Sequence, residues 1–581
     1  MNMIQAAREQ VAHLTQAAYE RAAQQGLLPS GQTIRGSVEV PKDSRNGDFA
    51  SSFAMAGARA LGMAPRAIAQ IILDHLELEG SYFQRSEIAG PGFLNFFYDH
   101  SWYGGVLSAV EADPAEYGGS DEGHGQKVMV EFVSANPTGP MHMGNARGGV
   151  LGDTLANVLR REGYDTWKEF YVNDAGNQIH KFAQSIHARY MQLLLGEDNY
   201  PFPEEGYHGD DIRELARGFY DLHGEAYRDA PEEKWEADMA AFGLARNIPK
   251  MREDLRKYRI EYDEWFFESV LHNSGYVAET VELLGRKGWT YEKEGALWLD
   301  TAGLLREKYL REGKSREQVD KLELKDDVLR RANGFYTYFA ADIAYHRNKF
   351  EKRGFDKVIN VWGADHHGHV ARLQAALDGL GLDGSHRLIV VLMQLVKLMQ
   401  NGQEVRMSKR TGKAIQLSDL LDEVPVDAAR FLFNMKDAGT QMKFDLDLAV
   451  QQDAENPVYY VQYAHARICS ILRALKADGI EPRACTNEEL MLLKEPEEVE
   501  LIRHMASYTD EIIAAAKAYD PARINHYVIT LATLFHKFYS ACRVKGVEDG
   551  LCAARLTLCV CAKTIIRNVL TMFKITCPDS M

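Results

Sequence analysis

The hydrophobic and polar positions of residues 1–120 predict a small unit of mixed helix and strand. Helical periodicity and short alternating runs follow one another in this region. The predicted helices are Met3–Gln25 and Ala64–Glu77, and the predicted strands are Gly36–Val40 and Gly92–Phe97. We therefore expect an α+β domain at residues 1–120. A stretch rich in Gly, Asp and Pro, 112–126, follows it and is typical of a linker.

A parallel sheet is predicted after this linker. The apolar strand Lys127–Ser134 leads into a Pro/Gly turn, a helix from about Gly144 to Arg161 and a second strand, Thr166–Val172. Strand, helix and strand in this order form a βαβ unit, which requires parallel strands. Further buried strands are predicted at Lys357–Trp362 and Leu388–Met393. The long, mainly helical stretch between the two groups of strands must then be an insertion, which we place at about 190–290.

From about Val426 to the end the pattern is helical. The predicted helices are Tyr463–Leu475, Val499–Tyr519, Asn525–Cys542 and Arg555–Phe573. The chain thus divides into residues 1–120, a sheet-containing unit at 121–425 and a helical bundle at 426–581. The fold class is α/β, flanked by a small α+β domain and an all-α bundle.

Composition narrows the class of protein. The 581 residues are 46% hydrophobic and 26% charged, which excludes disordered, collagen-like and fibrous chains. No apolar run approaches the ~20 residues that a membrane helix needs. The seven cysteines lie in the last fifth or so of the chain, without a C-x-x-C pair, and suit a reducing compartment. We expect a cytoplasmic protein with no membrane association and no structural zinc.

The net charge of −16 is unevenly distributed along the chain. Residues 197–238 hold 14 acidic and 4 basic residues, a net of −10, whereas 541–581 carry a net of +3. Nucleic-acid binding needs a local basic face rather than a basic total, so the overall charge does not exclude it. We expect the acidic segment to be a solvated insertion that faces away from any nucleic acid.

A first candidate site follows the strand that begins at Lys127. The sequence SANPTGPMHMGNARGG, residues 134–149, ends this strand and opens the next helix. A helix N-terminus offers free N–H groups and a positive dipole end to phosphate, and glycines allow a nucleotide to approach closely. His142 can donate a hydrogen bond to a phosphoryl oxygen. The alternative is a Gly/Pro-rich turn that holds one histidine without function.

A second candidate site is the sequence VRMSKRTGK, residues 405–413, which follows a predicted hairpin of Val396–Met399 and Glu404–Val405. Its cations, on a loop that contains glycine, can wrap a triphosphate and stabilise pyrophosphate as it leaves. The alternative is an exposed basic hairpin loop.

Together the two motifs resemble the signatures of class I aminoacyl-tRNA synthetases. His142-Met143-Gly144-Asn145 is similar to H-I-G-H, and Arg406-Met407-Ser408-Lys409 is similar to K-M-S-K. Within this class the chain most closely resembles the arginyl-tRNA synthetase family, over essentially its whole length. The supporting sequences are VEFVSANPTGPMHMGNARGG, EFYVNDAGNQI, YFAAD, GADHHGH, DAAR (similar to the D-A-L-R of the family's anticodon-binding domain) and NGDFA.

The resemblance implies a Rossmann-type catalytic domain at 121–425, a tRNA-elbow-binding domain at 1–120 and an anticodon-binding bundle at 426–581. The implied reaction forms arginyl-adenylate from L-arginine and ATP, with Mg²⁺ accompanying the ATP. The arginyl group then moves to the 3′-terminal ribose of tRNA(Arg), and AMP and pyrophosphate are released. Family resemblance also suggests that adenylate formation needs bound tRNA. We expect a monomer.

The resemblance also implies roles for individual residues. The implied catalytic residues are His142, Gly144, Asn145, Arg406 and Lys409. The implied ATP contacts are Pro140, His142, Gly144, Asn145, Asp365, His366, Met407, Ser408 and Lys409. The implied arginine contacts are Glu131, Ser134, Asn136, Tyr338 and Asp342. The implied tRNA contacts are Arg45, Asn46 and Phe49 at the elbow and Tyr459, Tyr463 and Arg467 at the anticodon.

Residue chemistry supports some of these roles. A planar guanidinium pairs best with carboxylates, so we assign it to Glu131 and Asp342, and the α-amino or carboxylate end to Asn136. Each carboxylate could instead be a surface or capping charge, and some of the tyrosines could simply pack in the bundle. The histidines of GADHHGH are metal-ligand types, but adjacent histidines do not converge tetrahedrally, so we predict nucleotide or amino-acid contact and no metal site.

Other functions remain open at this point. Another class I synthetase with a zinc-thiolate pocket, such as the cysteine enzyme, is disfavoured because no cysteine precedes Cys469. A tRNA-binding protein that has lost its chemistry is supported by the departures Asn145 and Arg406. It is opposed by the retained His142, Lys409 and Asp342. A small nucleotidylyltransferase would not need the bundle. No large extra α/β unit is predicted, so we expect no editing domain.

Overall fold

The computed structural model describes residues 2–407 and 414–581. Its N-terminal unit is an antiparallel sheet of order β1-β2-β4-β3 covered by helices. Asn2 caps the first helix, because its side chain accepts from the N–H of Gln5. The elements are α1 (Met3–Gln24), β1 (Val38–Glu39), β2 (Phe49–Ser51), α2 (Phe53–Leu61), α3 (Pro65–Asp74), β3 (Phe83–Ala89), β4 (Phe93–Tyr98) and α4 (His100–Ala112).

The predicted parallel sheet is confirmed, with the strand order β12-β11-β5-β6-β7. Its strands are β5 (Lys127–Glu131), β6 (Asp165–Val172), β7 (Glu264–Phe267), β11 (Lys357–Gly363) and β12 (Leu388–Met393). The helix α5 (Gly144–Arg161) joins β5 to β6 with the predicted bounds. β5 ends at Glu131, before the predicted Ser134, because Val133 and Ser134 have φ of 70° and 42° and turn the chain out of the sheet.

Two segments are inserted into this sheet, and the predicted range of 190–290 needs correction. The first holds α6 (Asn177–Leu195), α7 (Asp210–His223) and α8 (Glu232–Lys257), which share a hydrophobic core of their own. β7 lies inside the predicted range, yet it pairs in parallel with β6. A run of four residues such as EWFF is too short for periodicity to identify as a strand.

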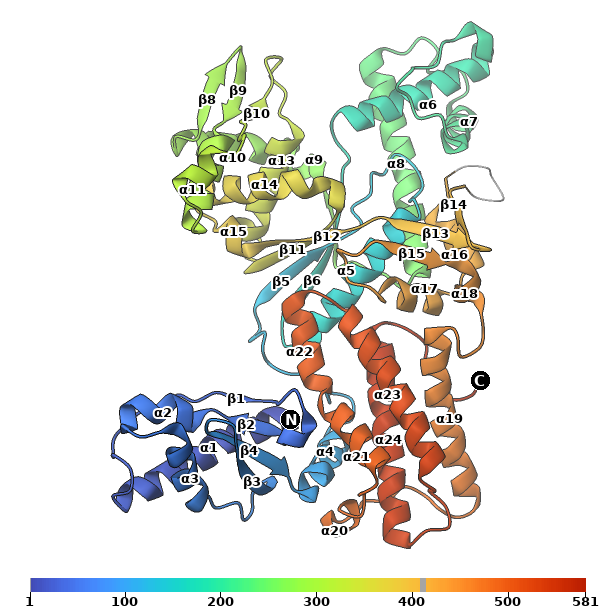
Figure 1. Cartoon of the computed structure of the whole chain (residues 1–581). Coiled ribbons are helices and arrows are strands. Elements are labelled where there is room, and N and C mark those ends of the chain that lie inside the picture. Colours follow the sequence, from blue (N-terminus) through green and yellow to red (C-terminus); the bar gives the residue numbers. More distant parts are fainter. Residues whose placement is uncertain (1, 408–413) are drawn as a thin grey trace.

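The second insertion follows β7 and carries a small antiparallel sheet of order β10-β9-β8 (Figure 1). Thr337 caps the helix that returns to the main sheet, because its hydroxyl accepts from the N–H of Ala340. The elements are α9 (Glu268–Asn273), α10 (Tyr276–Arg286), β8 (Thr290–Lys293), β9 (Ala296–Leu299), α11 (Thr301–Arg311), α12 (Arg316–Asp320), β10 (Asp327–Arg330), α13 (Tyr338–Arg347) and a π-helix (Asn348–Lys352).

After β11 the chain builds the other wall of the unit that holds the parallel sheet. β13 pairs with β14 antiparallel and with β15 in parallel, so β15, inside the predicted bundle range of 426–581, packs with the sheet unit. The elements are α14 (His367–Leu380), α15 (Gly384–Arg387), β13 (Val396–Gln400), β14 (Gln403–Val405), α16 (Leu417–Glu423), α17 (Val426–Phe433), β15 (Met442–Asp445) and α18 (Leu446–Val450).

The C-terminal region forms the predicted helical bundle (Figure 1). Its helices are α19 (Pro457–Ala477), α20 (Asn487–Leu490), α21 (Pro496–Ala506), α22 (Tyr508–Ala518), α23 (Ala522–Ala541) and α24 (Asp549–Met572). The predicted single helix Val499–Tyr519 is two helices that meet at Ser507. In the described part of the chain, no helix has both the length and the apolar character needed to cross a membrane.

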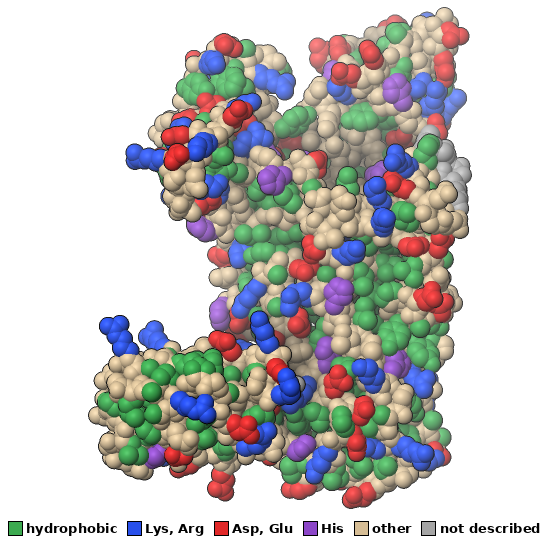
Figure 2. Space-filling model, in the orientation of Figure 1, with side chains coloured by type: hydrophobic (Ala, Val, Ile, Leu, Met, Phe, Trp, Pro, Cys, Tyr) green, Lys and Arg blue, Asp and Glu red, His purple; other side chains and the backbone are tan. Residues whose placement is uncertain are grey.

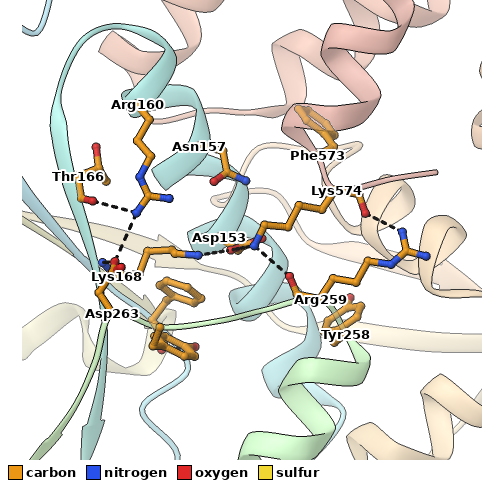
Figure 3. Close-up of polar contacts among 12 residues, drawn as sticks. Asp153, Asn157, Arg160, Thr166, Lys168, Tyr258, Arg259, Asp263, Phe573 and Lys574 are labelled. Atoms are coloured by element: carbon orange, nitrogen blue, oxygen red, sulfur yellow. Dashed lines mark hydrogen bonds and ion pairs between the residues drawn. The ribbon is translucent and has the colours of Figure 1, made fainter. Parts of the chain in front are cut away.

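A buried cluster of charges joins α5 to the C-terminal segment (Figure 3). Asp153, in the middle of α5, is fully buried and accepts from Lys168 Nζ at 3.0 Å and Lys574 Nζ at 2.9 Å. Arg430 Nη2 also donates to Asp153, at 2.6 Å. Arg430 belongs to the DAAR sequence and further donates to the carbonyl of Phe573. The DAAR sequence therefore lies at the junction of the unit that holds the parallel sheet and the bundle.

The N-terminal unit is anchored to the bundle through Asp48. Its carboxylate accepts from the N–H of Tyr98 at 2.7 Å and pairs with Arg503 of α21 at 2.6 Å. In the space-filling view the molecule is deeply notched between the N-terminal unit and the unit that carries β8–β10, and Lys and Arg side chains are seen along this notch (Figure 2).

Candidate active site

The first sequence motif is joined by backbone hydrogen bonds to the segment that leads into α16. The segment from Met141 to Met143 runs antiparallel to the segment from Ile415 to Leu417. The N–H of Met143 donates to the carbonyl of Ile415, and the N–H of Leu417 donates to the carbonyl of Met141, both at 2.9 Å. Ser408 and Lys409, which the sequence assigns to ATP, lie outside the described residues.

His142 is exposed at the N-terminal end of α5, where a phosphate would meet the positive end of the helix dipole. The N–H of Gly144 donates to His142 Nδ1 at 3.1 Å, so Nε2 carries the proton of the neutral ring and points elsewhere as a donor. A Cβ at Gly144 would lie 3.2 Å from Nδ1, so a side chain there would displace the imidazole. Asn145 is half-buried and Pro140 is exposed beside it.

Arg147, in the first turn of α5, fixes the segments around this end of the sheet. It is buried and donates to the carbonyls of Gln394 and Thr440 at 3.0 Å and of Asp437 at 2.8 Å. Burial lowers the pKa of its guanidinium. A buried guanidinium with several carbonyl acceptors holds loops that have few backbone partners of their own. The sequence analysis missed this role, although Arg147 lies inside the first motif.

A cavity of about 570 Å³ opens at the carboxyl ends of β5 and β11. Of the residues that the sequence assigns to substrates, it is lined by Glu131, Ser134, Asp342, Asp365 and His366. The other main polar and aromatic groups that line it are Tyr171, Tyr345, His346, Trp362, His369 and Arg372. Ligands of open α/β sheets bind at this edge. Tyr171 belongs to the EFYVNDAGNQI sequence and His369 to GADHHGH, but the others had no motif to identify them.

Two predicted arginine contacts lie outside the cavity lining. Tyr338 is 44% exposed, and its ring lies 3.7 Å from the position that a Cβ would take at Gly176. It stands on the same face of α13 as Asp342, one turn away. Asn136 is exposed in the loop after β5. Tyr338 and Asn136 therefore lie outside the wall that Glu131 and Asp342 share.

The carboxylates of the cavity have fixed partners. Ser134 Oγ donates to Glu131 Oε1 at 3.0 Å, and Lys349 Nζ lies 2.5 Å from Glu131 Oε2. His369 Nε2 lies 2.9 Å from Asp342 Oδ2. Burial raises the pKa of the neighbouring Tyr171 hydroxyl, and the carboxylates of Glu268 and Asp342 raise it further. The cavity thus holds negative charge and keeps its phenols protonated.

The residues predicted to contact the tRNA elbow differ in exposure. Arg45 and Asn46 are exposed, and Arg45 pairs with Asp43 at 2.6 Å. Phe49 is 0% exposed, so the prediction that it contacts tRNA is wrong. Its ring packs edge-on against Phe83 and Tyr98 in the core of the N-terminal unit. The alternation of β2 places this side chain on the buried face of its sheet.

In the bundle, a second cavity of about 420 Å³ is lined by Tyr463 and Arg467 together with Tyr539, Arg473 and the last residue, Met581. Arg467 Nη1 donates to Tyr463 Oη at 3.0 Å, and its guanidinium lies 5.3 Å from the centre of the Tyr539 ring. Tyr459, also assigned to the anticodon, is half-buried and is absent from this lining.

The acidic segment 197–238 reaches the first motif. α7 begins at Asp210 and buries Ile212, Leu215 and Phe219 against its own insertion. Asp211 Oδ2 lies 3.4 Å from the position that a Cβ would take at Gly139. Asn247 of α8 donates to the carbonyl of Pro137 at 2.9 Å. The insertion therefore lies against the Pro/Gly turn that precedes His142.

Within residues 2–407 and 414–581, the groups of His, Cys, Asp and Glu that could share one ion are His465–Cys469–Asp579 and His180–Glu232–Glu236. Neither belongs to the cavity that Glu131 and Asp342 line. The absence of a structural zinc stays a prediction.

Comparison with known proteins covers the whole chain. The model of the class I catalytic domain of the arginine type matches residues 107–198 and 259–469. The arginyl-tRNA synthetase N-terminal domain matches 7–98, and the DALR anticodon-binding domain matches 461–581. The interval between the two catalytic matches, 199–258, corresponds to α7 and α8 of the acidic insertion.

Similar proteins agree over the full length. The arginine–tRNA ligase of Caldanaerobacter subterraneus subsp. tengcongensis is 50% identical and covers 100% of both chains. That of Ruminiclostridium cellulolyticum is 48% identical over 99% of each. The structure of the Thermus thermophilus arginyl-tRNA synthetase shares the fold, with a TM-score of 0.70, 20% identity and coverage of 98% and 100%. The chain belongs to the arginyl-tRNA synthetase family of class I aminoacyl-tRNA synthetases.

Proposed function

We infer that this chain attaches L-arginine to tRNA(Arg). It forms arginyl-adenylate from arginine and ATP and transfers the arginyl group to the 3′-terminal ribose, with release of AMP and pyrophosphate. The observation that carries this inference is the antiparallel pairing of Met141–Met143 with Ile415–Leu417 beside a cavity lined by Glu131 and Asp342. A nucleotide motif and a carboxylate pocket thus share one edge of the sheet.

The first step is an in-line displacement at the α-phosphate of ATP by the arginine carboxylate. It asks the protein for positioning and charge stabilisation rather than covalent chemistry. We assign His142 Nε2 to a phosphate oxygen, because Gly144 occupies Nδ1. Gly144 and Asn145 hold the nucleotide close to the start of α5, and Pro140 lines its approach. Asp365 and His366, at the outer side of the cavity, would contact the adenosine.

The basic loop would bind the β- and γ-phosphates. We assign this role to Lys409, with support from Arg406, Met407 and Ser408, and Mg²⁺ would accompany the ATP. Arg406 is exposed and pairs with Glu404 at 3.1 Å. A surface pair of this kind is weak, so the guanidinium can exchange its partner for phosphate.

Arginine would bind with its guanidinium toward Glu131 and Asp342 and its backbone end toward Asn136 and the nucleotide. The tRNA would place its anticodon at the bundle cavity of Tyr463 and Arg467, with Tyr459 nearby, because exposed rings and a cation suit unstacked bases. Arg45 and Asn46 would contact the elbow. We propose that the enzyme acts as a monomer and that tRNA binding assists adenylate formation.

The test is exchange of labelled pyrophosphate into ATP, measured with and without arginine and tRNA. We expect exchange that depends on arginine and tRNA and that collapses in Lys409→Ala. Lys443→Ala, which changes an exposed lysine on the neighbouring β15, is the matched control and should keep wild-type exchange. Exchange in the absence of tRNA would contradict only the proposal that tRNA binding assists adenylate formation. No exchange with any amino acid, together with intact tRNA binding, would favour a protein whose chemistry has been lost.

A further inference from the structure

A buried lysine lies directly behind the arginine cavity. Lys349 is 0% exposed, and its Nζ lies 2.5 Å from Glu131 Oε2 and 3.5 Å from Asn360 Oδ1. It stands on the π-helix that continues α13, three residues beyond His346 and seven beyond Asp342. This spacing brings all three side chains to one face of the helix. A buried ammonium is costly without a partner, so the pairing with Glu131 fixes both groups.

Hydrogen bonds connect this lysine to the second carboxylate residue of the cavity. Asn360 Nδ2 donates to His346 Nε2 at 2.8 Å, and His346 Nδ1 donates to the backbone carbonyl of Asp342 at 2.8 Å. His346 therefore has one donor and one acceptor nitrogen, which is the neutral ring. Burial holds the pKa of His346 well below its ordinary value, in agreement with this.

The hydrogen bonds run from Glu131 through Lys349, Asn360 and His346 to the backbone carbonyl of Asp342. In each of these bonds the donor and the acceptor are fixed. The ammonium can only donate, so the Asn360 oxygen must face it and the Asn360 amide N–H must face His346. Lys349, Asn360 and His346 are buried, so water does not compete for these bonds. A buried network of this kind restricts the Glu131 carboxylate at one end and the backbone of Asp342 at the other.

Charge gives the network a second consequence. Among these four residues, Glu131 and Asp342 contribute two negative charges and Lys349 one positive charge, while His346 is neutral, so the group carries a formal net charge of −1. Asp365, His369 and Arg372 also line the cavity, and His369 pairs with Asp342. Without Lys349, the nearly buried Glu131 would lose its counter-charge and the contact that fixes its orientation. A displaced carboxylate would be a poorer acceptor for the substrate.

We propose that Lys349 is a positioning residue for substrate specificity: as the buried partner of Glu131 it holds that carboxylate oriented toward the cavity, so that the cavity requires a cationic side chain. The proposal rests on the proposed function, since it takes arginine as the substrate. Lys349 does not touch arginine itself, because Glu131 lies between Lys349 and the cavity.

The test compares Lys349→Met, Lys349→Gln and Lys349→Arg with the wild type in aminoacylation. In Lys349→Met we expect the KM for arginine to rise at least about 10-fold, with kcat changed less than about threefold, because ground-state and transition-state binding are lost together. Citrulline is the neutral urea isostere of arginine. The preference for arginine, measured as the ratio of the inhibition constant of citrulline to the KM for arginine, should fall by a similar factor. Lys349→Arg should restore both values toward the wild type.

Lys352→Met is the matched control, since Lys352 is exposed on the same π-helix and should keep wild-type kinetics. Lys349→Gln retains a hydrogen-bond donor without charge and replaces Lys349→Met in the test if that variant does not fold. It too should raise the KM for arginine. A wild-type KM and citrulline ratio in a folded Lys349→Gln or Lys349→Met would overturn the proposal. So would a loss of kcat at unchanged KM. Failure of the wild type to use arginine would instead sink the proposed function.

Discussion

The N–H of Met143 donates to the carbonyl of Ile415 at 2.9 Å and thereby ties the start of α5 to the segment that leads into α16. Met143 precedes the first residue of α5, and Ile415 lies two residues before the first residue of α16. The N–H of Leu417 also donates to the carbonyl of Met141, so backbone hydrogen bonds flank His142 on both sides. The N–H of Gly144 then positions the imidazole itself, because it donates to Nδ1.

Replacement of Gly144 by alanine should impair catalysis without unfolding the protein. The new Cβ would lie 3.2 Å from His142 Nδ1 and would shift the imidazole from the position that we assign to phosphate binding. We expect kcat for pyrophosphate exchange to fall by about 10²-fold or more, because an electrostatic donor is misplaced. Gly218→Ala, in the interior of α7 with its nearest neighbour at 3.5 Å, should keep full activity. Equal activity of the two variants would contradict the assigned role of His142.

Asp153→Asn should strongly destabilise the junction between α5 and the bundle. The substitution leaves Lys168 and Lys574 without their shared carboxylate (Figure 3), and Arg430 loses the same partner. Breaking a buried ion pair costs about 3–5 kcal/mol, which urea unfolding can measure. Asp165→Asn, at an exposed position at the start of β6, should cost less than about 0.5 kcal/mol.

The same carboxylate should contribute to acid unfolding. Burial alone would raise the pKa of Asp153, but Arg430, Lys168 and Lys574 together lower it below its ordinary value of 3.8. A lowered folded-state pKa gives stability that is present above this value and is lost as the pH falls through the folded-state pKa. If Asp153→Asn and the wild type lost equal stability between pH 5 and pH 2, the charge cluster would not be the cause.

Glu162 should produce the opposite pH dependence. It caps the C-terminal end of α5 in a buried site, and burial raises its pKa to about 7, although Ser120 donates to it at 2.5 Å. The folded state then favours the protonated acid. Its contribution to stability is complete below the ordinary value of 4.5 and is lost as the pH rises through about 7.

We therefore expect Glu162→Gln to gain on the wild type as the pH rises from 5 to 8, by up to about 3 kcal/mol in unfolding free energy. Thermal or urea unfolding at several pH values measures this difference. Other groups titrate alike in both proteins, so their contributions cancel in the difference between the two unfolding free energies. A difference that does not change with pH would show that Glu162 is ionised throughout.

Tyr463→Ala should weaken tRNA binding selectively. Stacking of a base on an aromatic ring is worth about 1–3 kcal/mol, so the KM for tRNA should rise about 10-fold while the KM for arginine stays constant. Tyr291→Ala provides a matched control, because Tyr463 and Tyr291 are both 38% exposed and Tyr291 lies on β8, outside the bundle. Equal effects of the two substitutions on the KM for tRNA would remove the bundle cavity from the tRNA interface.

Local sequence determined much of the fold. The bounds of α5 and of β12 agree with their predictions, because a buried helix or strand carries its periodicity within its own residues. The motif sequences likewise identified the family, and five of the residues assigned from them line the cavity: Glu131, Ser134, Asp342, Asp365 and His366. The short strand β7 was missed, since four residues carry too little pattern and the strand is defined by its pairing with β6.

Tertiary structure decided which side chains face one another. Phe49 lies in a sequence that resembles a tRNA-binding motif, yet sheet packing buries its ring. Lys349 carries no motif, yet the return of α13 to the sheet places it against Glu131 of β5. Periodicity is a property of neighbours along the chain, whereas burial and ion pairing depend on residues brought together from distant positions. The sequence by itself therefore determined the elements with a long periodic pattern and the reaction, and only packing decided how the cavity lined by Glu131 and Asp342 is charged.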